Sequence, residues 1–74
     1  MHPLLQLAAN LAVATCLIAD TGVHHDQAFS QAITSHQRQF QALVHNEDQA
    51  ALVGRTSRIV AEQTCPHNFN RQWL

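Results

Sequence analysis

The chain has 74 residues, of which 46% are hydrophobic and 12% are charged, and its formal net charge is -1. This composition excludes intrinsic disorder, and four basic side chains against five acidic ones leave no basic surface for a nucleic-acid backbone. A domain of this size buries only about 60% of the surface that its unfolded chain exposes, so its own core gives little stability. Small domains gain further stability from disulfides, metals or partner chains. Since two cysteines allow only one disulfide, we expect a partner chain to supply this stability.

Residues 4–19 form an uncharged and largely apolar run. The run is shorter than the roughly 20 residues that a membrane span needs, so we expect no span. Pro3 suits a first helical turn, and leucine and alanine are strong helix formers, so the sequence predicts a helix over about 3–20. Ala12-Val13-Ala14 fits a cleavage site and Ala14-Thr15-Cys16 resembles a lipoprotein box, which leaves export or lipid anchoring as an alternative.

The second half of this predicted helix is apolar on nearly every side, which is typical of a buried helix. Two further helices of the same short chain cannot cover all of these sides. We therefore expect a homodimer, formed through the first helix into a helical bundle. The expected dimer-interface residues are Leu4, Leu7, Leu11, Leu17 and Ile18.

The second predicted helix covers residues 23–45. Asp20-Thr21-Gly22 breaks the chain before it, with glycine suited to end one helix and Asp20 or Thr21 suited to cap the next. Apolar side chains that include Phe29, Ile33 and Phe40 recur at the helical period, whereas the opposite side is polar. The pattern predicts an amphipathic helix with one side in water.

The third predicted helix covers residues 47–64, because Asn46 can cap its start and Pro66 ends it. Small residues at helical spacing form a ridge that another helix can approach; they are Ala50, Gly54, Ser57 and Ala61. The tail, residues 65–74, carries Phe69, Trp73 and Leu74 as apolar anchors. No segment alternates with period two, so we predict an all-α fold with one domain, residues 1–74, of three helices.

Candidate sites for chemistry are weak. His25 and His36 share a face but lie about 16 Å apart along a helix, too far for one metal ion within a chain. His24 and His45 lie nearer the polar side. Cys65-Pro66-His67 has no second ligand pair and no acid placed to orient the imidazole. We therefore expect no metal, no cofactor, no catalytic residue and no enzymatic activity.

The two cysteines leave two states open. A Cys16–Cys65 disulfide can form if the third helix returns alongside the first. In a reducing cytosol, both side chains would instead be small buried thiols. We expect a cytoplasmic location, and hence the thiols.

The expected function is a small protein-binding module that regulates or inhibits another protein, as accessory proteins, anti-activators and co-chaperones of this size do. Helix-in-groove binding would use apolar anchors, namely Phe29, Ile33, Phe40, Phe69 and Trp73. The alternative is a dimeric DNA-binding regulator that presents Arg55 and Arg58. A helix-turn-helix over residues 48–64 would place polar Gln49 and Arg55 where apolar residues belong.

Overall fold

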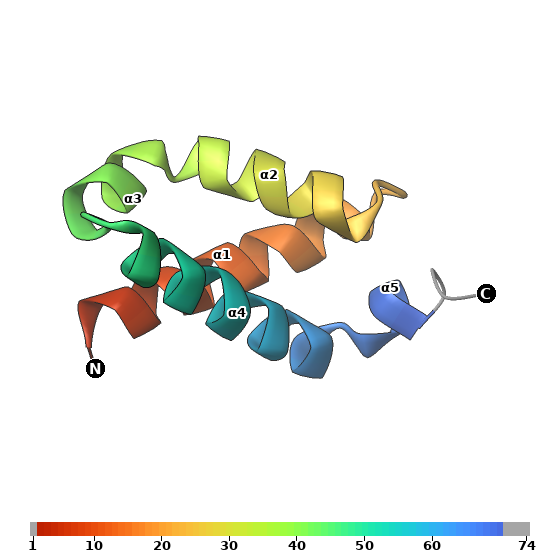
Figure 1. The fold of residues 1–74 in the computed structure, drawn as a ribbon. Coiled ribbons are helices and arrows are strands. Elements are labelled where there is room, and N and C mark those ends of the chain that lie inside the picture. Colours follow the sequence, from red (N-terminus) through yellow and green to blue (C-terminus); the bar gives the residue numbers. More distant parts are fainter. Residues whose placement is uncertain (1, 71–74) are drawn as a thin grey trace.

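The structure, a computed structural model, describes residues 2–70. In chain order, its helices are α1 (Pro3–Ala19), α2 (His25–Ser35), α3 (Gln37–Leu43), α4 (Glu47–Thr64) and α5 (Pro66–Asn70). These described residues contain no strand, so the predicted all-α class is confirmed. Helix α1 lies between α2 and α4, and each of these packs against it, whereas α2 and α4 contact each other little (Figure 1).

Helix α1 supplies the largest share of the core. Pro3 occupies its first turn, and the Nδ1 atom of His2 caps it by accepting from the backbone N–H of Leu4 at 3.1 Å. Leu7 and Leu11 are fully buried among side chains of α2, α3 and α4. Among the described helices, none has both the length and the hydropathy that a bilayer crossing requires.

The structure changes the role of three residues expected at a dimer interface. Leu4, Leu7 and Leu11 pack in the chain's own core, because α2 and α4 together cover the side of α1 on which they lie. Of the other two expected residues, Leu17 is 65% exposed and Ile18 is half-buried against the same core. The buried leucines therefore stabilise the single chain.

The single helix predicted over residues 23–45 is wrong, because the chain forms α2 and α3 with a break at His36. The backbone of His36 leaves the helical region, with φ -112° and ψ 25°. Just before it, the hydroxyls of Thr34 and Ser35 donate to carbonyls four residues back, and the His36 ring contacts the carbonyl of Ala32 at 3.0 Å. Side chains that bond to helix carbonyls in this way compete with the backbone and bend or end helices.

The connection between α1 and α2 also differs in detail from the expected one. Gly22 has φ +102°, which glycine adopts without the steric cost that other residues bear. A positive φ is typical of a glycine that ends a helix, which is the role predicted for Gly22. The cap of α2 is His24, whose Nδ1 accepts from the N–H of Asp26 at 3.2 Å. Neither Asp20 nor Thr21 caps α2, because the helix begins only at His25.

Helix α4 begins as predicted. The side chain of Asn46 accepts from the N–H of Gln49 at 2.8 Å, and the Gln49 side chain accepts from the N–H of His45 at 2.7 Å. The helix then continues unbroken to Thr64. Residues 48–64 therefore contain no turn, and this segment is not a helix-turn-helix.

A disulfide joins Cys16 on α1 to Cys65 at the end of α4, with their Cα atoms 5.9 Å apart. The surrounding core cluster is made of small side chains, Ala12 and Ala61, together with one large one, Phe69. The expected tail is partly helical, because Pro66 is well suited to the first position of α5. The covalent bond thus holds α1, α4 and α5 together where apolar burial is small.

We predict that a double variant, Cys16→Ala with Cys65→Ala, is less stable by about 4 kcal/mol. The estimate comes from the closure entropy of a loop spanning 49 positions. Thermal unfolding followed by far-UV circular dichroism measures the loss. A reductant should lower the midpoint of the native chain and leave that of the double variant unchanged. A double variant that unfolds at the same midpoint as the oxidised native chain would contradict the prediction.

Candidate functional site

A groove with a volume of about 380 Å³ lies between α2 and α4. It exists because both helices pack on α1 but make little contact with each other (Figure 1). Thr15 of α1 lines it between these walls. The other lining residues are His25, Asp26, Phe29, Ala51, Gly54, Arg55, Ser57, Arg58, Ala61 and Phe69.

The α2 wall of the groove is aromatic. Phe29 is half-buried, and the ring of His25 stacks on that of Phe69, with centroids 4.8 Å apart. Phe69 belongs to α5 and is held in place by the disulfide at Cys65, four residues earlier. The disulfide, which lies outside the groove, therefore positions the Phe69 side chain that lines this end.

The α4 wall carries small residues, among them Ala51, Gly54 and Ala61, together with Arg55 and Arg58. Ser57 and Ala61 are buried, whereas a Cβ atom added to Gly54 would meet nothing within 4 Å. The small-residue ridge predicted from the sequence therefore has two parts. Its buried part lies in the core of the chain, and its open part at Gly54 leaves the groove hollow.

The polar atoms of the groove are few and mostly paired. The Thr15 hydroxyl donates to the carbonyl of Leu11 at 2.7 Å, and Arg58 pairs with Glu62 at 3.1 Å. Arg55, in contrast, has no hydrogen-bond or ion-pair partner within residues 2–70 and is exposed. The groove is thus an apolar hollow with an available cation at its α4 rim.

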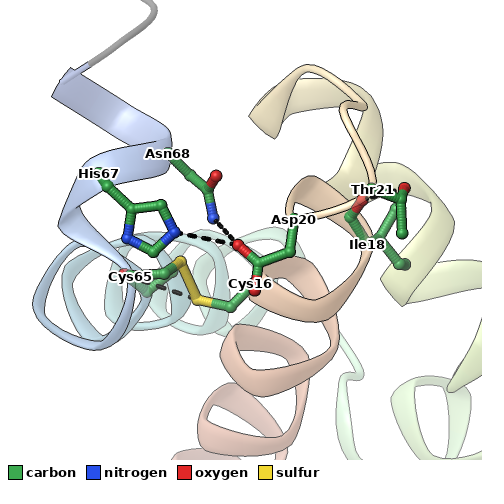
Figure 2. Close-up of polar contacts among 8 residues, drawn as sticks. Cys16, Ile18, Asp20, Thr21, Cys65, His67 and Asn68 are labelled. Atoms are coloured by element: carbon green, nitrogen blue, oxygen red, sulfur yellow. Dashed lines mark hydrogen bonds and ion pairs between the residues drawn. A yellow bond between two sulfur atoms is a disulfide. The ribbon is translucent and has the colours of Figure 1, made fainter.

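Beside the disulfide, Asp20 at the end of α1 contacts His67 and Asn68 of α5, and we call these three residues the Asp20 clasp (Figure 2). The Oδ1 atom of Asp20 lies 3.0 Å from His67 Nε2 and accepts from Asn68 Nδ2 at 2.7 Å. The expectation that no acid orients His67 is therefore wrong, since folding brings the end of α1 to α5. Because both sulfurs are in the disulfide, the clasp has no thiolate nucleophile to activate, and it holds α5 in place.

The predicted partner-binding residues are divided by the fold. Phe29 and Phe69 line the groove, whereas Ile33 and Phe40 are half-buried against the core around α1. Trp73 lies outside the described residues. On α1, Leu5, Val13 and Leu17 are exposed.

The groove itself was missed by sequence reasoning, although its components were noted. The sequence predicts Phe29 as an anchor that enters a partner's groove, and Gly54 as a point of close helix contact. The relevant signal is the number of small residues in the third predicted helix, which exceeds what one helix contact needs. Only the divergence of α2 and α4 shows that some of them face an open space.

Comparison with known proteins adds no assignment. No protein family matches the sequence, and no curated protein or solved structure resembles it significantly.

Replacement of Gly54 by alanine should stabilise the protein by about 1 kcal/mol. Gly54 is inside α4, alanine is the better helix former by that amount, and the added methyl group meets no neighbour. Chemical denaturation of the native chain and the variant gives the difference. A destabilised Gly54→Ala variant would mean that this position is closely packed, contrary to the open wall described above.

Proposed function

We propose that this chain is a small, non-enzymatic protein-binding module whose groove between α2 and α4 accepts an amphipathic helix of another protein. The observation that carries the proposal is the groove, with aromatic side chains on one wall and small residues on the other. In this role the chain regulates or inhibits its partner by covering the partner's apolar helix face. Such helix-in-groove recognition depends on a few apolar anchors.

The shape of the α4 wall favours a helix as the occupant. Helix axes pack 8–10 Å apart, at distances set by the side chains at the contact, and small residues allow the closer approach. Gly54 and Ala51 provide this low surface at the groove. The half-buried Phe29 then supplies apolar area for a large side chain of the incoming helix.

The charge of the α4 rim favours an acidic residue beside the apolar face of that helix. Arg55 is exposed and without a partner in the described chain, so a carboxylate can pair with it without breaking an existing contact. Charge pairs at an interface rim add specificity and speed association. The proposed partner is therefore a helix with large apolar side chains and at least one nearby Asp or Glu.

Selection from a displayed library of helical peptides tests this function. We expect selection on the native chain to enrich amphipathic peptides that carry an acidic residue. Gly54→Leu should weaken their binding more than tenfold, because the leucine side chain fills the groove. Gly54→Ala is the matched control, adds one methyl group in open space and should retain binding.

Two results would contradict the proposal. One is the absence of any enriched helical peptide, and the other is equal affinity of the peptides for Gly54→Leu and Gly54→Ala. Circular dichroism of both variants establishes that they are folded, so that lost binding reports on the groove.

We also propose that the chain acts as a homodimer through the outer side of α1. Val13 and Leu17 are exposed there, and Leu5 is exposed nearer the start of the helix. A second copy would remove this apolar surface from water, at about 25 cal/mol per Å² of buried area. The proposed interface is thus narrower than the one expected from the sequence, since Leu4, Leu7 and Leu11 are used in the core.

Leu17→Asp should convert the dimer into a monomer, because it places a charge in the proposed apolar interface. Light scattering should then report 8.2 kDa for the variant and twice this mass for the native chain. Leu52→Asp is the matched control, since Leu52 is an exposed leucine on α4 and lies outside the proposed interface. A native chain that is monomeric at high concentration would refute the dimer.

The disulfide favours an oxidising compartment as the place of action. Disulfides persist outside the cytosol, whereas cytosolic reductants keep thiols reduced. The cytoplasmic location expected from the sequence implied free thiols at Cys16 and Cys65, whereas the structure joins them in a disulfide. We therefore propose that the module meets its partner in an oxidising environment.

A further inference from the structure

Three potential metal ligands converge at the start of α2. His24, His25 and Asp26 each offer a nitrogen or oxygen atom, and these ligand atoms all lie within 4.8 Å of one another. Sequence reasoning compared His25 only with His36 and placed His24 on the polar side, so it did not consider this group. The cluster lies at the end of α2 where His25 and Asp26 also line the groove.

The distances are close to those within a zinc site. His25 Nδ1 lies 3.1 Å from Asp26 Oδ1, and two ligand atoms of a tetrahedral zinc ion are about 3.3 Å apart when each bond is about 2.0 Å. A metal ion can therefore lie between these two atoms, and any proton on Nδ1 is released to solvent when it binds. His24 Nδ1 is 3.9 Å from Asp26 Oδ2, so a small rotation of its ring brings in the third ligand.

The exposure of the three side chains suits an accessible site. The His25 side chain is only 10% exposed, and its ring is stacked between those of His24 and Phe69, at 4.4 and 4.8 Å. This packing fixes one ligand before the ion arrives. Asp26 and His24 are 76% and 53% exposed, so an ion can enter from solvent and keep water in its remaining coordination positions.

The charges around the cluster limit its affinity for a cation and make the Asp26 carboxylate necessary for binding. The N-terminus of α2 carries partial positive charge, which disfavours a cation. Two neutral imidazoles add no charge to offset this effect, whereas the Asp26 carboxylate adds a negative one. Ligation through His24 Nδ1 also gives up its hydrogen bond to the N–H of Asp26.

We propose that His24, His25 and Asp26 form a binding site for a divalent transition-metal ion, with Zn²⁺ as the best match. Two imidazole nitrogens and one carboxylate oxygen are ligands that zinc prefers, and three protein ligands leave the coordination open to water or to a further ligand. This inference rests on the cluster alone and is independent of the groove's proposed partner.

Isothermal titration of the full, disulfide-bonded and tag-free chain with zinc chloride tests the site. We expect one ion to bind per chain. His24→Ala and Asp26→Asn should each weaken binding more than about tenfold. His45→Ala is the matched control, because His45 is also exposed but lies outside the cluster, and it should bind as the native chain does.

NMR of the histidine rings provides a second measurement that avoids replacing the buried His25. Zinc should shift the ring signals of His24 and His25 and leave those of His36 and His45 in place. The site is refuted if zinc does not bind, or if binding is unchanged in both His24→Ala and Asp26→Asn. Ring shifts at His36 or His45 in place of the cluster would likewise refute it.

Discussion

The disulfide between Cys16 and Cys65 joins the two longest helices at a place where their own side chains bury little apolar area. Ala12 and Ala61 allow α1 and α4 to approach but contribute few contacts, and the larger leucines lie in the other core cluster. For a chain of 74 residues, whose core is small, a crosslink worth about 4 kcal/mol is a large part of the total stability. The bond also positions α5, so that Phe69 lies at the end of the groove.

The groove forms because α2 and α4 both pack on α1. The buried face of α1 contacts both α2 and α4, so these helices lie on either side of it without closing against each other (Figure 1). Small residues on α4 keep that wall low, and the disulfide and the Asp20 clasp secure the α5 end (Figure 2). An apolar hollow of this kind in a small domain is a surface that a partner can fill, which is the basis of the proposed function.

Local signals predicted the helices that depend on nearby residues. Pro3, Asn46 and Pro66 act within one or two turns of themselves, and α1 and α4 begin and end close to the predicted residues. The break at His36 was not predicted, because the apolar period continues across it from Phe29 to Phe40. There, bonds from side chains to carbonyls outweigh a pattern that otherwise favours one helix.

The sequence by itself determined the all-α class, most of the helix boundaries and the excess of apolar residues on α1, since these depend on propensity, capping and periodicity along the chain. Only the tertiary structure decided which apolar residues become core, as with Leu7, and which stay exposed, as with Leu17. It also decided the pairing of Cys16 with Cys65 and the contact of Asp20 with His67. These pairs are separated by more than 45 positions, and their distances depend on how α1 and α4 pack.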